Sequence, residues 1–329
     1  MNPPRRRLLK LAASAAALPV LAHKAAAQAY PSRPITVIVP ASAGGPTDAI
    51  GRILAERMGA LLGQTIVIDN VSGASGSIGV GKVAQAQPDG YTLGIGQWSH
   101  YVLNGAIYSL QYDLLADFAP ISLVVTGPMM LVSKKSLPAD DLKGLIAWLK
   151  ANADKASAGT GGVGSPPHIS GIFFQRMTDT RFQFVPYRGT APAMRDLVAG
   201  QIDFMFDQAS NVLPQLQGGT IKAFAVTAKE RLPSAPQVPT VDEAGLPDLY
   251  ISVWHGLWAP KATPRDVIAK LNGAAVAALA DPSVRQKLAG LGQEIPPREQ
   301  LTPDALRAYQ KAEIDKWWPI VKAAGIKAE

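Results

Sequence analysis

No cysteine occurs among the 329 residues of the chain. Disulfides, thiolate metal sites, cysteine nucleophiles and a lipid-modified cysteine are therefore excluded. The four histidines are far apart in the sequence and no His-Glu-x-x-His motif occurs, so we expect no metal site. Because 47% of the residues are apolar, the chain is predicted to be globular, with enough length and core for two domains.

A long apolar run is also missing. Residues 5–10, Arg-Arg-Arg-Leu-Leu-Lys, precede an apolar stretch at residues 11–22 that is too short to span a bilayer comfortably. This order is typical of a signal peptide; the arginines resemble the twin-arginine export motif, and Lys24 disfavours the general secretory route. The small residues of Ala27-Gln28-Ala29 predict a mature N-terminus at Tyr30, with cleavage after Ala27 as the alternative. We expect an exported, freely soluble protein without stable membrane insertion after cleavage; a retained membrane anchor is the alternative.

Most of the excess positive charge lies in the predicted signal peptide, residues 1–29. The formal net charge is +7, but five basic and no acidic residues lie in this segment. Removing those five from the 32 basic residues leaves 27 against 25 acidic ones, a net charge of +2. Charge therefore gives no argument for nucleic acid or an anionic membrane as a partner.

Short β-rich runs alternate with helical patterns along the mature chain. In the first half, apolar residues with helical spacing at 50–61 separate the runs 35–39 and 65–68. The second half repeats this order, with runs at 156–159, 182–186 and 202–206 and helical patterns at 169–177 and 190–199. Such alternation predicts an α/β fold with largely parallel strands in two lobes.

Two extended apolar runs, residues 121–132 and 250–258, flank the second lobe and are predicted to be crossover strands of a hinge. We therefore expect lobe I to contain residues 30–125 and 254–329, and lobe II residues 126–253. A capping residue followed by proline predicts several helix starts. These pairs are Ser165-Pro166, Thr263-Pro264, Asp281-Pro282 and Thr302-Pro303.

Two glycine-rich loops each lie between a predicted strand and a predicted helix, at residues 40–48 and 159–168. Free backbone N–H groups and the helix dipole favour an anion at such positions, so one loop on each lobe predicts a shared cleft. Gly159, Gly161 and Gly164 also match a dinucleotide-binding fingerprint, with Arg188 placed for a 2′-phosphate. Because the ribose-binding acid is missing, we do not expect a dehydrogenase or a nicotinamide cofactor.

Six motifs are spread over nearly the whole mature chain. They are Tyr30 to Ile35, Pro40 to Asp48, Asn70 to Gly79, Ala86 to Thr92, Gly162 to His168 and Val185 to Gly189. In this order they resemble the patterns Y-P-x-[RK]-P-I, P-[FY]-x-x-G-G-x-x-D, N-x-x-G-A-[GS]-G-x-[IL]-G, A-x-P-D-G-Y-T, G-x-G-[ST]-x-x-H and V-P-Y-[KR]-G. These patterns belong to the solute receptors of tripartite tricarboxylate transporters, called Bug proteins. Ala41 departs from the family's aromatic residue, and Gln97-Trp98-Ser99-His100 from its small hydroxyl residues.

The resemblance implies a two-lobed periplasmic binding protein fold, type II-like, with two parallel-rich sheets joined by crossover strands. It implies a monomeric periplasmic receptor, without catalysis or cofactor, that captures a small dicarboxylate or aromatic carboxylate for the membrane subunits of a transporter. The two loops would act as pincers on a ligand carboxylate, partly through ordered water. The expected ligand-binding residues are Ala41, Ser42, Gly44, Gly45, Pro46, Thr47, Asp48, Ser75, Ser77, Gln97, Trp98, Gly162, Val163, Gly164, Ser165, His168 and Asp207.

Several of these residues have a structural interpretation beside the functional one. Thr47 or Asp48 is also suited to cap a helix, and His168 to bond the backbone at a helix terminus. Asp207 either meets a ligand hydroxyl or amine, or caps the turn that follows its strand. Trp98 either forms an apolar wall for an aromatic or longer acid, or packs in the core.

Two alternative functions use the same predicted fold. An exported hydrolase would act through Ser165 and His168, although no G-x-S-x-G motif is present and Ser165 looks like a helix cap. A ligand-sensing partner of a two-component system would use the same binding domain for signalling. The sequence does not separate the sensor from the transport receptor.

Overall fold

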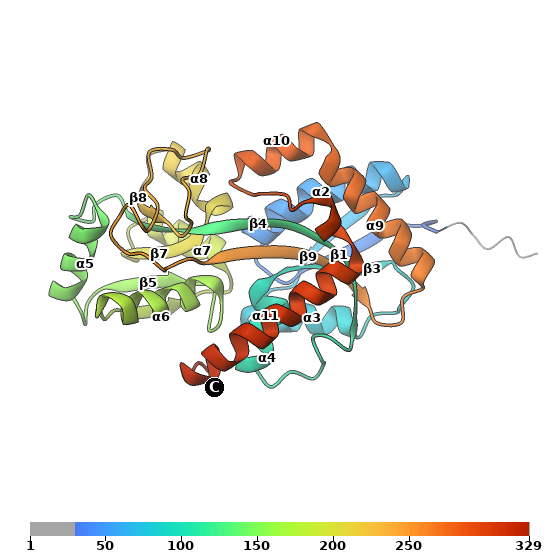
Figure 1. Cartoon of the computed structure of the whole chain (residues 1–329), viewed down its shortest axis with the longest axis horizontal. Coiled ribbons are helices and arrows are strands. Elements are labelled where there is room, and N and C mark those ends of the chain that lie inside the picture. The colour runs from blue at the N-terminus through green and yellow to red at the C-terminus, as the bar shows by residue number, and fades with distance from the viewer. Residues whose placement is uncertain (1–29, 329) are drawn as a thin grey trace, which may run out of the picture.

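The structure is a computed structural model that describes residues 30–328, so the predicted signal peptide lies outside the described residues. Figure 1 shows an elongated molecule whose two halves are joined by the strands β4 (Phe118–Lys134) and β9 (Ser252–Pro260). These strands pair in antiparallel fashion from Phe118 opposite Pro260 to Pro128 opposite Ser252. They include most of the two apolar runs that predict the crossover strands, and the predicted lobe boundaries fall inside them.

Lobe I, the half that carries the N-terminus, has three parallel strands in the order β2-β1-β3, with β9 antiparallel beside β3. Every residue of β1 except Thr36 is buried, as expected for a strand covered on both faces. In Figure 1, α2, α9 and α10 lie above this sheet, and α3, α4 and α11 lie below it. The bounds are β1 (Ile35–Val39), α2 (Pro46–Leu62), β2 (Ile66–Asn70), η1 (Ala74–Gly76), α3 (Ser77–Ala84), β3 (Thr92–Gln97), η2 (Ser99–Leu103), α4 (Asn104–Ile107), α9 (Arg265–Ala280), α10 (Pro282–Gly290), η3 (Arg298–Leu301) and α11 (Pro303–Ala323).

Lobe II repeats this plan. Its strands β7, β5 and β6 are parallel, and the second half of β4 pairs with both β7 and β8 in antiparallel fashion. One continuous path of strands, β2-β1-β3-β9-β4-β7-β5-β6, therefore runs through both lobes. The bounds are α5 (Leu142–Ala151), β5 (Ser157–Thr160), α6 (Pro166–Thr178), β6 (Gln183–Pro186), α7 (Thr190–Val198), β7 (Phe204–Gln208), α8 (Ala209–Gln217) and β8 (Ile221–Val226).

The helix starts follow the capping prediction in part. Asp281 caps α10 by accepting from Ser283 N at 2.9 Å, and Thr302 caps α11 by accepting from Ala305 N at 3.2 Å. Thr263 was expected to be the N-cap residue of α9, but α9 begins at Arg265 and its N-cap residue is Pro264; the Thr263 hydroxyl donates to the Pro260 carbonyl at 2.8 Å. Ser165 is the N-cap residue of α6, yet its side chain makes no capping hydrogen bond.

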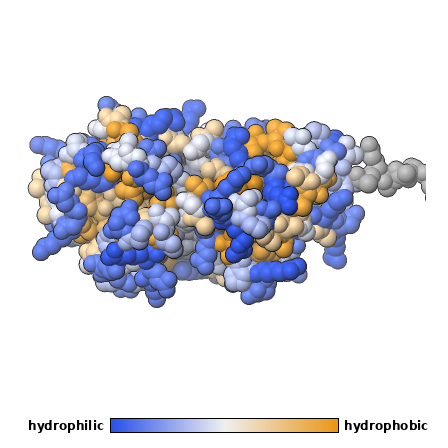
Figure 2. Space-filling view, turned by 90° about the horizontal axis from the view of Figure 1, so that it is seen from above, coloured by the Kyte–Doolittle hydropathy of each residue, from blue (hydrophilic) through white to orange (hydrophobic). Residues whose placement is uncertain are grey.

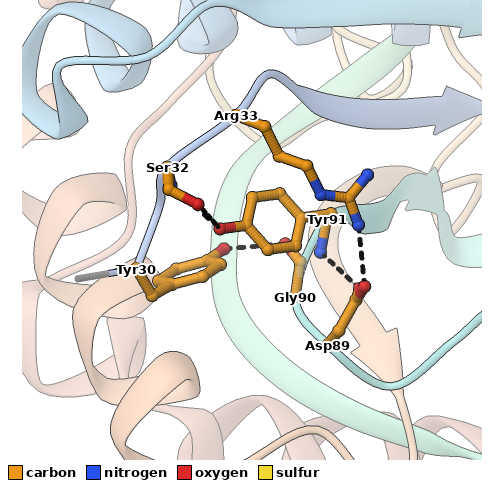
Figure 3. Close-up of polar contacts among 6 residues, drawn as sticks. All are labelled: Tyr30, Ser32, Arg33, Asp89, Gly90 and Tyr91. Carbon is orange, nitrogen blue, oxygen red and sulfur yellow. Dashed lines mark hydrogen bonds and ion pairs between the residues drawn. The ribbon is translucent and has the colours of Figure 1, made fainter. Parts of the chain in front are cut away.

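The predicted mature N-terminus is bound to lobe I by the segment 89–91 (Figure 3). The Tyr30 hydroxyl donates to the Gly90 carbonyl at 2.7 Å, and Arg33 pairs with Asp89 at 2.9 Å. The Arg33 guanidinium also lies over the Tyr91 ring, 4.0 Å from its centroid. The first and fourth motifs of the sequence thus contact one another and fix the start of β1.

The surface is mixed in character. On the face seen in Figure 2, hydrophilic and hydrophobic residues are interspersed, with no continuous apolar band. Within residues 30–328, no single helix is long and apolar enough to cross a membrane; α9 and α10 reach that length only together, bent by 71°.

Candidate functional site

A pocket of about 150 Å³ lies between the two lobes. Lobe I contributes the loops after β1 and β2 together with Gln97, His100 and Tyr108, and lobe II contributes the loops before α6 and α7 together with Gln208. The two glycine-rich loops of the sequence analysis therefore line one pocket. Its volume is well below the roughly 300–1,000 Å³ of pockets for drug-sized ligands, so it suits a small molecule.

Three helices begin at the wall of the pocket. These are α2 after Gly45, α6 after Ser165 and α7 after Gly189, and none of these N-cap residues makes a side-chain capping bond. Each helix N-terminus carries a partial positive charge of about half a unit, from aligned peptide dipoles and free N–H groups. Their convergence favours an anion in the pocket.

The loop Gly73–Gly76 forms another part of the wall and has an unusual backbone. All four of its residues have positive φ, including the non-glycine residues Ala74 at 44° and Ser75 at 48°. Left-handed conformations of such residues are strained and persist only where their surroundings hold them, commonly at binding sites. Here Asn104 donates to the Ser75 carbonyl at 2.9 Å and helps to hold the loop.

The lobes touch one another around the pocket. Gln208 Nε2 of lobe II donates to Gln97 Oε1 of lobe I at 2.7 Å, and the Tyr108 hydroxyl donates to the Val163 carbonyl at 2.8 Å. Gly189 packs so closely on Ser42 that a Cβ atom at residue 189 would lie 2.3 Å from Ser42 Oγ. The lobes thus meet in direct contacts beside the pocket.

The charge of the pocket wall comes from one side chain. Among residues 30–328, Arg188 is the only lining residue with a formal charge, and no aspartate or glutamate of this part lines the pocket. His100, which the π-helical turn η2 brings into the wall, is neutral because burial lowers its pKa to about 3. The remaining polar lining groups are hydroxyls, amides and backbone.

Nine of the predicted site residues line this pocket. They are Ala41, Ser42, Gly45, Pro46, Thr47, Ser75, Gln97, Gly162 and Ser165. The other eight lie outside the lining, and most of them support the wall from behind. They are Gly44, Asp48, Ser77, Trp98, Val163, Gly164, His168 and Asp207.

Asp48 holds the loop of residues 40–48, the first predicted pincer, in shape. Its carboxylate accepts from Gly44 N at 2.8 Å, from Arg52 Nε at 2.9 Å and from Asn70 Nδ2 at 3.0 Å. Burial acts to raise the pKa of Asp48, but these hydrogen bonds outweigh it and keep the pKa below its usual value. Asp48 therefore ties the loop to the start of α2 and to the end of β2.

The loop of residues 159–168, the second predicted pincer, is also held by hydrogen bonds to its own backbone. Gly161 N donates to Ser165 Oγ at 3.1 Å, and Gly164 N donates to His168 Nδ1 at 3.2 Å. The His168 ring packs edge-on against Phe184, and burial lowers its pKa to about 4. Because Nδ1 accepts a backbone hydrogen bond, the neutral ring carries its proton on Nε2. This is the backbone-bonding role that the sequence offered for His168.

Asp207 is completely buried at the end of β7. Its carboxylate accepts from Gln208 N at 2.8 Å and from Asn211 Nδ2. Burial raises its pKa to about 7, against the opposing effect of these hydrogen bonds and of Thr190. Asp207 therefore lies beneath the pocket-lining residues Gln208 and Thr190, in the capping position, and direct contact with a ligand stays a prediction.

Trp98 packs in the core and is not a wall of this pocket. Only 1% of its surface is exposed, and its ring lies edge-on to Trp317 of α11, with centroids 4.7 Å apart. The turn η2 begins directly after Trp98, so the chain turns at the strand end and the indole lies toward α11. The sequence shows that Trp98 follows a strand but not which way it faces.

Sequence reasoning missed several lining residues. Outside the predicted loops 40–48 and 159–168 they include Ser72, Gly73, Ala74, Gly76, His100, Tyr108, Tyr187, Arg188, Gly189, Thr190 and Gln208. Pro40, Gly161, Pro166 and Pro167 also line the pocket and lie inside those two predicted loops. Tyr187, Arg188 and Gly189 belong to the V-P-Y-[KR]-G motif, which was the available signal. Tyr108 and Gln208 lie far from any motif, and only the fold brings them to the pocket.

A second, larger cavity of about 710 Å³ lies beside the hinge strands. Its walls come from Thr126–Pro128, residues 227–234, Tyr250–Ser252, the loop 289–294 and α11. Three acidic and three basic side chains line it, so its wall has no net preference for an anion. Neither glycine-rich loop reaches this cavity, and the smaller pocket is therefore the better candidate for the site. Within residues 30–328, no cluster of three His, Asp or Glu residues could hold a metal ion.

Comparison with known proteins gives consistent matches. The family described as tripartite tricarboxylate transporter family receptor, TctC, matches residues 50–326. The UPF0065 protein in the TAR-I ttuE-ttuC' intergenic region of Agrobacterium vitis is 39% identical over 97% of this chain and 92% of the relative. The solved structure of the periplasmic binding protein BugD is 40% identical, with a TM-score of 0.88, covering 91% of this chain and 100% of BugD. The solved structure of MatC from Rhodopseudomonas palustris, with bound malate, is 38% identical, with a TM-score of 0.85, covering 89% of this chain and 100% of MatC.

Proposed function

Because the chain belongs to the receptor family of tripartite tricarboxylate transporters, we propose that it captures a small organic carboxylate in the pocket between its lobes. The observation that carries this proposal is the convergence of three helix N-termini on a small pocket without an acidic side chain. The chain is a solute receptor of the periplasmic binding protein type, and its relative MatC was solved with a bound carboxylate, malate.

The pincers bind the carboxylate in two ways. Backbone N–H groups at the starts of α2 and α7 donate directly, and hydroxyls such as those of Ser42, Ser75 and Thr47 bind through ordered water. The proline pairs at the start of α6 lack N–H groups, so that helix contributes through its dipole. Water-bridged anchoring lets one frame accept different acids.

The proposed function includes where the protein acts and where its ligand goes. The mature chain begins near Tyr30, acts as a soluble monomer in the periplasm and hands its ligand to the membrane subunits of the transporter. The role of a sensing partner uses the same pocket, and the genes beside this one distinguish the two, since the transporter needs two membrane subunits and the sensor a kinase.

The hydrolase alternative finds no support in the geometry. A serine nucleophile needs an adjacent base that takes its proton. The Nδ1 atom of His168 is occupied by Gly164 N, and Ser165 Oγ accepts from Gly161 N. Both side chains thus bond the backbone of their own loop.

A thermal-shift screen tests the receptor function. A ligand that binds only the native state stabilises it by RT ln(1 + [L]/Kd), about 2.7 kcal/mol at a hundredfold excess over Kd. We expect small carboxylates to raise the unfolding temperature of the mature protein and neutral sugars of similar size to leave it unchanged. If no carboxylate shifts the midpoint while sugars or metal ions do, the receptor proposal for carboxylates fails.

A further inference from the structure

His100 carries an N–H group that the protein itself does not use. The Nδ1 atom of its ring accepts from Gln97 N at 3.3 Å. The ring is neutral, because burial lowers its pKa to about 3. A neutral ring that accepts at Nδ1 carries its proton on Nε2, so Nε2 is a hydrogen-bond donor.

The Nε2 atom of His100 is open to the pocket between the lobes. Within residues 30–328 it makes no hydrogen bond, yet it is not among the completely buried atoms without a partner, as His255 Nδ1 is. His100 lines the pocket and is only 3% exposed. The small exposed part of the ring therefore includes Nε2 and faces the pocket.

Two glycines hold the ring in this orientation. An added Cβ atom at Gly76 would lie 2.6 Å from His100 Cδ2 and 2.8 Å from Nε2, and one at Gly96 would lie 3.4 Å from Nδ1. Gly76 also lines the pocket, and its φ of 90° lies in the left-handed region that favours glycine. A donor that is already held in place loses little conformational freedom when a ligand binds.

Larger polar side chains of the wall already donate within the protein. The Tyr108 hydroxyl donates to the Val163 carbonyl at 2.8 Å, and the Tyr187 hydroxyl donates to Asp196 Oδ2 at 2.7 Å. The Nε2–H group of His100 has no such acceptor among the described residues. It gains most from a negatively charged acceptor, because hydrogen bonds to ionised groups are about twice as strong as neutral ones.

Resting on the proposed receptor function, we infer that His100 is a ligand-binding residue whose Nε2–H group donates to the carboxylate held between the pincers. The neutral ring supplies a directional hydrogen bond without adding a formal charge to the wall. In the ligand-free protein a water molecule accepts this bond, and the carboxylate takes its place.

Two substitutions at this residue separate ligand binding from a structural role. In His100→Asn the Oδ1 atom can replace Nδ1 as acceptor for Gln97 N, but no donor reaches the position of Nε2. In His100→Gln the amide N–H group reaches the position of the ring Nε2, and the acceptor near the backbone is lost. A purely structural ring is therefore replaced better by asparagine, and a ligand donor better by glutamine.

Calorimetric titration of the mature protein and both variants with malate, succinate, adipate and benzoate measures the difference. We expect His100→Asn to weaken the tightest-binding acid about 10- to 150-fold, as for loss of a hydrogen bond to a charged group. His100→Gln should weaken it less than about 5-fold, as for a hydrogen bond kept with altered geometry. Unchanged affinity in His100→Asn, or equal weakening by both variants, overturns the inference.

A magnetic resonance titration of the unaltered protein decides the matter even if a variant does not fold. The mature chain has three histidines, His100, His168 and His255, which can be labelled with ¹⁵N. Saturation with the tightest-binding of these acids should move the Nε2 proton of His100 downfield and slow its exchange with water. The Nε2 proton of His168, which lies outside the pocket lining, should move less. A His100 resonance that stays in place while the acid binds overturns this inference alone, whereas absence of binding by every acid overturns the receptor proposal itself.

Discussion

At Gly189 a single added methyl group would oppose the contact between the lobes. Its backbone, at φ 132° and ψ 170°, lies in a region that is essentially restricted to glycine. A Cβ atom there would lie 2.3 Å from Ser42 Oγ and 2.9 Å from Ser42 Cβ, both on the opposite lobe. Gly189→Ala therefore has two separate effects, strain within lobe II and a clash that exists only when the lobes meet.

The two effects have different sizes and different assays. Backbone strain should lower the free energy of unfolding of the ligand-free protein by about 1–3 kcal/mol, measured by urea titration. Overpacking between the lobes should cost about 1–3 kcal/mol of closure, which corresponds to an increase in Kd of about 5- to 160-fold, measured by calorimetry. Ser42→Gly in the same chain removes most of the clash, so a double-mutant cycle should show a favourable coupling between the two positions.

Gly200→Ala is the matched control. Gly200 also has positive φ, at 77°, but nothing lies within 4 Å of an added Cβ atom. It should lose about 1–2 kcal/mol of unfolding free energy and keep the affinity of the unaltered protein. If Gly189→Ala binds its ligand with unchanged Kd while showing the same destabilisation, ligand binding does not need this contact between the lobes.

Three further predictions concern one buried and two partly buried side chains. Burial raises the pKa of Asp207 to about 7, above its value in the unfolded chain, so the native state holds the proton more tightly and the free energy of unfolding should fall as the pH rises from about 4 to 7. Asp207→Asn should flatten this dependence of unfolding free energy on pH. If the dependence is unchanged, Asp207 titrates normally. Trp317 lies between Trp98 of lobe I and Phe173 of lobe II. Trp317→Phe should therefore remove most of the ligand-induced change in tryptophan fluorescence. If the variant keeps the whole change, another tryptophan responds to the ligand. Tyr30→Phe should cost about 1 kcal/mol of unfolding free energy for one lost hydrogen bond, and no loss would mean that the N-terminal segment is not held by it.

Much of the fold could be predicted because its signals are local. The strand-to-helix order, the two crossover strands and the glycine-rich turns each depend on the spacing of residues that are neighbours in sequence. The cap at Asp281 was predicted for this reason. At Thr263 the prediction was one residue early, because Pro264 is the N-cap residue of α9, and the Thr263 hydroxyl bonds the Pro260 carbonyl at the end of β9.

The individual site residues depend on contacts that no local pattern encodes. Asp48 looks like a ligand residue in sequence, yet Asn70 and Gly44 satisfy its carboxylate and make it a brace for the pincer. Trp98 looks like a pocket wall because it follows a strand, but the turn after it places the ring against Trp317. In both cases one of the partners is distant in sequence, Asn70 for Asp48 and Trp317 for Trp98.

The contacts between the lobes at the pocket are the feature that the sequence predicts least. Arg188 and Gln208 lie on lobe II, and they line a pocket with Gln97 only because β4 and β9 carry the two lobes to the distance at which Gln208 bonds Gln97. A register shift in these strands would move the lobes relative to each other without altering either glycine-rich loop. Motifs therefore predict the two glycine-rich loops that line the pocket, whereas the contact of Gln208 with Gln97 depends on how the crossover strands set the two lobes against each other.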